Sequence, residues 1–231
     1  MITVERRTDP AVRVVTLDRP DRANALTPDG LADLGAAVAD APEPVVVLTG
    51  AGEAFCGGAD LSVVDDLDRE EAARFARLGQ RTAWAIADAD AVVVAGVDGA
   101  ARGGGVELAL ACDLRVATPD ATFAESGVAI GLFGAWGGTV RLPETLGWAD
   151  AADLALSGRT VDADGAKRTG LVSRVVDDPM TVAEEVADND PAALRTLKRR
   201  LRDDADRRTR ERREAAAFAD LIERRNATDR D

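Results

Sequence analysis

The sequence predicts an α/β fold, because short apolar runs rich in β-branched residues alternate along the chain with longer amphipathic stretches. With 231 residues, of which 46% are apolar, the chain can bury a sizeable core. Five runs are typical of buried strands: residues 12–17, 45–49, 91–97, 113–118 and 171–176.

Amphipathic stretches between these runs predict helices. The first, residues 28–40, follows Thr27, a residue type that caps helix N-termini. The second covers residues 70–89, and the third, residues 106–112, directly follows three glycines. A charged segment at residues 192–227 suits a helix hairpin that packs on the body or on a neighbouring subunit, and a solvated charged helix fits its spacing equally well.

Composition excludes several classes of function. The formal net charge of −13 argues against nucleic-acid binding, which depends on basic surface. We therefore expect small molecules or copies of the same chain as partners. No run of 18 apolar residues lacks a charge, and the N-terminus does not resemble a secretion signal, so the expected location is cytoplasmic, with no membrane partner.

The chain contains no histidine, which excludes Ser-His and Cys-His catalytic pairs and the common zinc sites. Cys56 and Cys112 are too few for a disulfide framework or a cysteine metal site, so we expect buried free thiols and no metal. Proton transfer must then fall to carboxylates.

The most informative stretch is AARGGGVELALACD, residues 100–113. A helix N-terminus exposes free N–H donors at a positive dipole end, and glycine allows a ligand to approach that backbone closely. Glu107 lies three residues after Gly104, so both face the same side of the helix. Because the neighbours of Glu107 are apolar, we expect its side chain to be buried, and because an unpaired buried carboxylate is costly, we expect it to have a functional role. The alternative is a Glu107 side chain that faces solvent.

A second glycine-rich turn, residues 50–60, invites a dinucleotide-binding interpretation, because Gly50 and Gly52 follow a strand. Phe55 stands where that fingerprint needs a glycine or alanine for close helix packing. A phosphate-binding loop is also excluded, because the chain has no Gly-Lys-Ser/Thr sequence.

Five ordered motifs over about residues 10–176 resemble the enoyl-CoA hydratase/isomerase (crotonase) family: RPDRANALT, LTGAGEAFCGGADL, VDGAARGGGVELALACDLRVA, FAESGVAIGLFGAWGGTVRLPETLG and LSGRTVDADGAKRTGLVSRVV. The resemblance implies a crotonase-like spiral of ββα turns in residues 1–178. It further implies a C-terminal helical oligomerisation region in residues 179–231, which closes the site and builds homotrimers, often paired into hexamers.

The resemblance also implies an enzyme that binds an acyl-CoA thioester. Two backbone N–H groups, at positions matching Ala59 and Gly104, would hold the thioester oxygen and stabilise an enolate. Glu107 matches the first of the two glutamates that hydratases use. Such chemistry needs no cofactor besides the coenzyme A that is part of the substrate. It needs hydrogen-bond donors at the thioester oxygen, where negative charge develops, and the two N–H groups would supply them.

The chain departs from the family at the second glutamate position, where Gly127 stands. Glu125 lies two residues earlier and could form a carboxylate pair with Glu107, one member acting as an acid, or could be a surface residue at a strand end. Hydration by this shifted pair, double-bond isomerisation by one base, and C–C cleavage or condensation all remain compatible. One carboxylate favours isomerisation chemically, whereas the resemblance over the whole pattern favours a hydratase, so we expect an enoyl-CoA hydratase or isomerase. A catalytically degenerate acyl-CoA-binding member is the alternative from another class.

Substrate-binding positions also follow from the resemblance. Arg22, with backbone groups near Ala23 and Ala25, matches a coenzyme A-contacting loop, although a plain surface arginine is the alternative. Asp60 and Leu61 should lie along the adenine and pantetheine path.

Two aromatic residues, Phe133 and Trp136, match the path of the acyl end. Their bulk would narrow the pocket. Both residues also fit a role as ordinary core aromatics.

Overall fold

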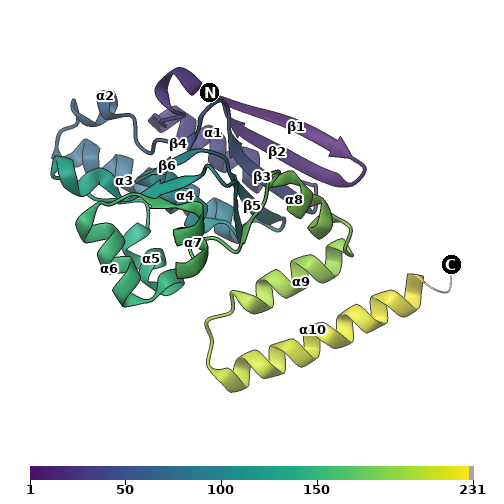
Figure 1. The fold of residues 1–231 in the computed structure, drawn as a ribbon. Helices are drawn as coiled ribbons and strands as arrows, with labels where there is room; N and C mark the ends of the chain where they lie inside the picture. Colours follow the sequence, from purple (N-terminus) through teal and green to yellow (C-terminus); the bar gives the residue numbers. More distant parts are fainter. Residues whose placement is uncertain (229–231) are drawn as a thin grey trace.

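The computed structural model of the protein describes residues 1–228 and contains two β-sheets with helices packed around them (Figure 1). The larger sheet has the strand order β1-β2-β3-β5-β7-β10, and the smaller one has the order β4-β6-β8-β9. The strands are β1 (Ile2–Thr8), β2 (Ala11–Leu17), β3 (Val45–Gly50), β4 (Ala54–Cys56), β5 (Val92–Val97), β6 (Ala100–Arg102), β7 (Leu114–Ala117), β8 (Thr122–Ala124), β9 (Val161–Asp162) and β10 (Arg174–Val175).

Side-chain caps fix where several helices begin. Thr27 accepts a hydrogen bond from the Gly30 N–H, as expected, and Asp68 forms a capping box with Glu71. The α-helices are α1 (Pro28–Ala39), α2 (Leu61–Val64), α3 (Arg69–Asp88), α4 (Gly104–Ala111), α5 (Gly138–Leu146), α6 (Trp148–Ser157), α7 (Ala163–Thr169), α8 (Met180–Ala187), α9 (Pro191–Leu201) and α10 (Arg207–Thr228), with short 3-10 helices η1 (Pro20–Arg22) and η2 (Ser126–Ile130).

The chain repeats one structural unit: a strand in the larger sheet, a short strand in the smaller sheet, then a helix. β3 is followed by β4 and α2–α3, and β5 is followed by β6 and α4. β7 is followed by β8, η2 and α5. Within each sheet the strands of successive units pair in parallel, so the chain winds as the expected spiral of ββα turns.

The core lies on both faces of the larger sheet. All six residues of β5 are buried, as is typical of a central parallel strand covered on two sides. One face packs against α1, α3 and α4, and the other packs against α8. α4 begins two residues after β6 ends, so the start of this helix lies where the smaller sheet contacts the helical layer.

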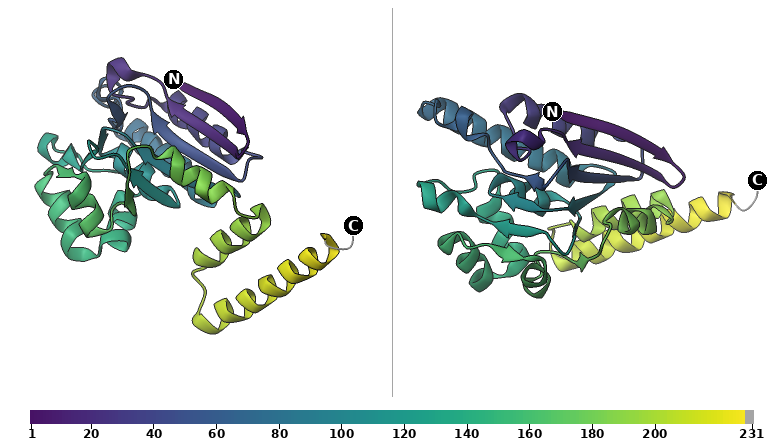
Figure 2. Two further views of the ribbon diagram at one scale, coloured as in Figure 1. Left: turned by 45° about the vertical axis from the view of Figure 1, so that its right-hand side comes forward. Right: turned by 45° about the horizontal axis from the view of Figure 1, so that its top comes forward.

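In Figure 1 and in the left view of Figure 2, α9 and α10 extend beyond the rest of the body, and α10 lies farther out than α9. Buried Lys198 of α9 holds the pair to the body through Asp113, at 2.8 Å, and through the carbonyl of Ala91, at 2.7 Å. α10 lies against α9, and four large apolar side chains of the pair are exposed: Leu197, Leu201, Phe218 and Ile222. The helix hairpin predicted at residues 192–227 is therefore confirmed.

Some sequence-based expectations differ from the structure. β1 was not anticipated, because its outward charges hide the alternation, and only Arg174–Val175 of the run at 171–176 forms a strand. The last three residues of the predicted C-terminal region, 229–231, lie outside the described residues. Among residues 1–228, no helix has both the length and the apolarity that a membrane crossing requires.

Candidate active site

Two glycine turns meet at the edge of the smaller sheet. One follows β4 and contains Gly58, and the other follows β6 and contains Gly103; both glycines have a positive φ, of +88° and +46°. The turns are so close that a Cβ atom on Gly58 would lie 2.9 Å from the backbone nitrogen of Gly104. Position 58 therefore requires glycine for two reasons: its φ is positive, and a side chain there would clash with the backbone of Gly104.

This contact brings Ala59 and Gly104 into the lining of the same cavity. Ala59 forms an isolated parallel bridge with Leu26, in which the next amide, that of Asp60, donates to the Leu26 carbonyl. Because neighbouring amides of an extended segment point to opposite sides, the Ala59 N–H is directed away from Leu26. Gly104 is the first residue of α4, where the N–H groups have no partner within the helix.

Glu107 lies in the first turn of α4 and is 1% exposed. Its Oε1 accepts hydrogen bonds from the backbone N–H of Trp136, at 2.9 Å, and from that of Gly138. Burial raises the pKa of Glu107 above its ordinary value, and these two N–H donors oppose the shift. The solvent-facing alternative for Glu107 is excluded.

The chain packs tightly around this carboxyl group. A Cβ atom on Gly134 would lie 2.7 Å from Cδ of Glu107, and a Cβ atom on Gly138 would lie 2.7 Å from its Oε1. The glycines of the segment GLFGAWGG therefore let the backbone pass beside Glu107 and direct N–H groups at it.

Glu107, Ala59 and Gly104 line a cavity of about 250 Å³, which we call the Gly104 cavity. Gly127, which the resemblance places at the family's second glutamate position, also lies in its wall. Within the described part of the chain, Glu107 is the one carboxylate among the lining residues. The lining includes Ala59, Leu61, Gly104, Glu107, Gly127, Phe133 and Trp136.

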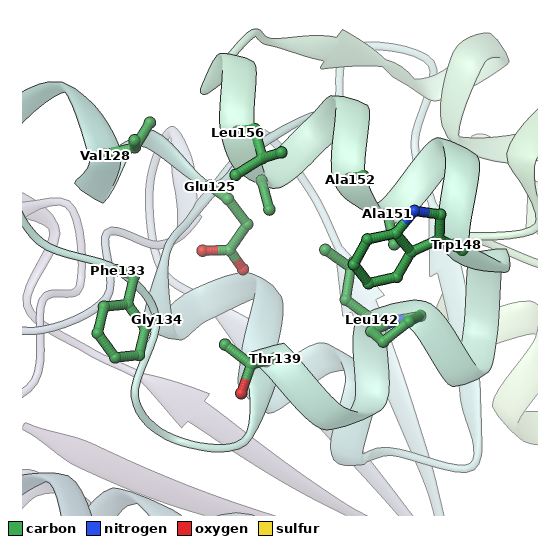
Figure 3. A pocket seen from close by; sticks show the side chains of 13 residues that line it. Glu125, Val128, Phe133, Gly134, Thr139, Leu142, Trp148, Ala151, Ala152 and Leu156 are labelled. Carbon is green, nitrogen blue, oxygen red and sulfur yellow. The ribbon is translucent and has the colours of Figure 1, made fainter.

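Glu125 is also buried, with 7% of its surface exposed, so the surface alternative for this residue is wrong. It lines a separate cavity of about 250 Å³ between η2, α5 and α6, which we call the Glu125 cavity (Figure 3). Burial and the nearby charge of Glu107 raise the pKa of Glu125 to about 8. Its Oε1 has no hydrogen-bond partner among residues 1–228.

The two aromatic residues of the predicted acyl path differ in their surroundings. Trp136 is 3% exposed and packs edge-to-face on Phe75, with its indole against the position where Gly104 would carry a Cβ atom. It belongs to the core and to the cavity wall at once. Phe133 is 72% exposed and lines both cavities, so it is no core residue.

The predicted coenzyme A-contacting residues lie beside the first glycine turn. The carbonyl of Ala23 accepts from the Gly57 N–H at 2.7 Å, and Ala25 would contact a Cβ atom on Gly57 at 3.8 Å. Arg22 is exposed at the end of η1, and Leu61 is exposed in the wall of the Gly104 cavity.

Asp60 is already engaged within the chain. It caps α2 through Ser62 and pairs with Arg19 at 2.5 Å. Hydrogen bonds from Ser62 and Arg19 hold its pKa below the ordinary range. The side chain therefore braces the turn that carries the Ala59 amide.

Sequence reasoning missed two supporting residues. Buried Asn24 has a φ of +58° and donates to the carbonyls of Ala51 and Ala54, which anchors the η1 loop to the first glycine turn. An asparagine between small residues is a signal for that conformation. Arg141 of α5 lowers the pKa of Glu107 by its charge, and no local pattern in the sequence indicates this.

Comparisons with known proteins agree with this geometry. The family model described as enoyl-CoA hydratase/isomerase matches residues 7–228. A short-chain-enoyl-CoA hydratase of Clostridium acetobutylicum is 35% identical over 201 residues, covering 82% of this chain and 77% of its own. A putative enoyl-CoA hydratase/isomerase of Bacillus subtilis is 42% identical over 198 residues, which cover 80% of this chain and 75% of its own.

A solved structure of an enoyl-CoA hydratase from Bacillus anthracis superimposes with a TM-score of 0.90 at 32% identity, covering 96% of this chain and 91% of that one. The fold is therefore the α/β crotonase fold, with two mixed sheets and C-terminal helices. The chain belongs to the enoyl-CoA hydratase/isomerase family and is an enzyme of that kind, acting on acyl-CoA thioesters.

Proposed function

We propose that the protein moves the double bond of an enoyl-CoA by shuttling one proton on Glu107, through an enolate held by the amides of Ala59 and Gly104. The observation that carries this proposal is that Glu107 is the one carboxylate in the described wall of the Gly104 cavity. A single carboxylate can remove a proton at one carbon and return it at another.

In the forward direction the Glu107 carboxylate takes a proton from C2 of a 3-enoyl-CoA. The electron pair spreads over C2 to C4 and onto the thioester oxygen, which forms a dienolate. The carboxylic acid of Glu107 then returns the proton to C4, which leaves the double bond between C2 and C3. No other atom is gained or lost.

The two amides supply the stabilisation that this step needs. Charge develops on the thioester oxygen only as the proton leaves C2, so fixed donors at that point favour the transition state over the bound substrate. The bridge to Leu26 leaves the Ala59 N–H free to donate on the opposite side, which supports this role, and the Gly104 amide would add the positive end of α4.

The ionisation of Glu107 fits a base. The N–H groups of Trp136 and Gly138 favour its carboxylate form, while burial keeps its proton affinity above that of an exposed glutamate. A base of raised pKa is better matched to the weakly acidic C2 proton.

Hydration is the second candidate, and the electrostatic contact between Glu125 and Glu107 favours it. One carboxylate and one neutral carboxyl group would then act on water and on C2. This candidate requires Glu125 to reach substrate past Phe133 and Gly134, the residues that line both cavities.

Substrate binding and assembly complete the proposal. Arg22 and the backbone near Ala23 and Ala25 would contact coenzyme A, with Asp60 bracing that side of the cavity and Leu61 lining it. The exposed apolar residues of α9 and α10, Leu197, Leu201, Phe218 and Ile222, support a homotrimer or a dimer of trimers built through the C-terminal region, residues 179–231.

The test compares two reactions of one chain length. Purified protein is given 3-hexenoyl-CoA, to follow isomerisation, and 2-hexenoyl-CoA in water, to follow hydration. The products are separated by chromatography and identified by mass spectrometry. The same assays are run on Glu107→Gln, Glu125→Gln and the exposed control Glu144→Gln.

We expect isomerisation to be the faster reaction, and we expect Glu107→Gln to lose far more of it than Glu125→Gln does. Faster hydration that both glutamine variants abolish equally would replace the proposal with the second candidate. Cleavage or condensation products would indicate C–C chemistry, and binding without any product would indicate a degenerate member of the family.

A further inference from the structure

The Glu125 cavity is not used by the proposed reaction, although it adjoins the site. Phe133 and Gly134 line both this cavity and the Gly104 cavity, so the two cavities share a wall at these residues. An acyl chain whose thioester oxygen lies at the Gly104 amide would enter this second space on the far side of that wall. The cavity of about 250 Å³ is large enough for several non-hydrogen atoms.

The walls of the Glu125 cavity suit a hydrocarbon chain. They are formed mainly by aliphatic and aromatic side chains of η2, α5 and α6, including Val128, Leu142, Ala152 and Leu156. Burial of methylene groups against such a surface is favourable, which makes an extended acyl chain a fitting occupant.

One polar group in this lining stands apart from the rest. Glu125 is more than nine-tenths buried, and its Oε1 has no hydrogen-bond partner within the described chain. Figure 3 shows its carboxyl group inside the cavity, flanked by Phe133 and Leu142. An unsatisfied buried polar atom is costly, and a ligand atom that paired with this carboxyl group would reduce that cost.

The protonation state of Glu125 sets the chemistry of that ligand atom. With its pKa raised to about 8, the carboxyl group is mostly neutral near pH 7 and can donate its O–H. An oxygen acceptor without charge is the matching partner, since an anion would add to the repulsion that Glu107 already exerts.

We propose that the Glu125 cavity binds the distal part of an acyl chain that carries an uncharged oxygen acceptor, such as a keto group, and that Glu125 donates a hydrogen bond to that oxygen. The inference rests on the proposed function for the position of the thioester, and it names the substrate class: enoyl-CoA thioesters with a long, oxygenated acyl chain. Glu125 is then a specificity-determining residue.

The test uses paired thioesters of equal chain length, one plain and one with a single methylene replaced by a keto group, the position of which is scanned along the chain. kcat/KM is measured for 3-enoyl forms, and Kd is measured by calorimetry for saturated forms that do not react. 3-Hexenoyl-CoA serves as the short reference substrate.

For the wild type we expect at least one keto position to be preferred about three- to tenfold over the plain chain, the range that one neutral hydrogen bond supplies. Glu125→Leu should abolish that preference, and Glu125→Gln, whose amide still donates, should retain it. Loss of preference in both variants, or its persistence in Glu125→Leu, overturns the inference.

A second pair of variants tests the cavity itself. Ala152→Phe fills it, so the ratio of kcat/KM for the long keto substrate to that for 3-hexenoyl-CoA should fall, and Ala149→Phe, an exposed position on the same helix, should leave the ratio unchanged. If Ala152→Phe alters the oligomeric state and not the ratio, the cavity binds a second copy of the chain and the inference is wrong. If the wild type binds the saturated keto chain preferentially but moves no double bond, the proposed function fails and the inference stands.

Discussion

The backbone N–H of Trp136 lies 2.9 Å from Oε1 of Glu107, across 29 residues of sequence. Together with the Gly138 N–H it holds one carboxyl group beside the cavity that Glu107, Ala59 and Gly104 line. Gly127, which the resemblance places at the second glutamate position of the family, lies in an earlier segment, η2. The turn that leads into α5 holds Glu107 in place.

The close approach of Gly134 to Glu107 predicts a kinetic effect. In Gly134→Ala the new Cβ atom would lie 2.7 Å from Cδ of Glu107 and displace the carboxyl group. A displacement near 1 Å is expected to lower kcat by about a hundredfold, with a small change in Tm. Steady-state kinetics and thermal unfolding measure both.

The matched control for this change is Gly35→Ala on α1, where the nearest atom to a new Cβ would be 3.7 Å away. It should keep the wild-type kcat. Full activity in Gly134→Ala would show that the position of Glu107 is not restricted by this backbone.

The raised pKa of Glu125 predicts how stability depends on pH. Below its ordinary pKa of 4.5 the carboxyl group is neutral in both the folded and the unfolded chain. Between 4.5 and about 8 only the unfolded chain releases the proton, so the free energy of unfolding falls as the pH rises, by a few kcal/mol in total. Glu125→Gln cannot ionise and should lack this decline.

Thermal unfolding of the wild type and Glu125→Gln between about pH 5 and pH 9 measures the difference. The two curves should diverge with rising pH, the variant becoming the more stable one, whereas exposed Glu144→Gln should follow the wild type. Parallel curves for Glu125→Gln and the wild type would show that Glu125 ionises at its ordinary pKa.

The buried pair of Lys198 and Asp113 predicts that α9 contributes to the stability of the body. In Lys198→Met the Asp113 carboxylate and the Ala91 carbonyl lose a partner at 2.8 Å and 2.7 Å. Removing one member of a buried pair costs about 3–5 kcal/mol, although the nearby Arg202 bonds to Asp113 and reduces this.

Chemical denaturation of Lys198→Met measures that loss. Arg199→Met removes an exposed ion pair with Asp90 on the same helix and should change the free energy of unfolding by less than about 1 kcal/mol. Equal effects of the two substitutions would contradict a specific role of the buried lysine.

The sequence predicted the elements that carry a strong local signal. β3 and β5 are continuous apolar runs, and α3 has a clear amphipathic period with an acidic cap. The short strands β4, β6 and β8 were not found, because three residues beside a glycine turn have no measurable period. They form because the spiral places them against one another.

The same distinction applies to the site. Gly104 and Glu107 could be predicted to lie on one side of a helix because one helical turn joins them, and both line the Gly104 cavity. The burial of Glu125 could not be derived, because the cavity around it is formed by α5 and α6, which are distant in sequence. Only tertiary packing distinguishes a buried carboxyl group from one at a strand end.

The most direct measurement is the exchange of C2 protons of a saturated acyl-CoA, butyryl-CoA, in deuterated water, followed by mass spectrometry. It isolates the step in which Glu107 acts beside the Ala59 and Gly104 amides, whatever the later fate of the enolate. The wild type and Glu144→Gln should incorporate deuterium at equal rates, and Glu107→Gln should be slower by about 10² to 10⁴-fold. Exchange at an undiminished rate in Glu107→Gln would contradict the account.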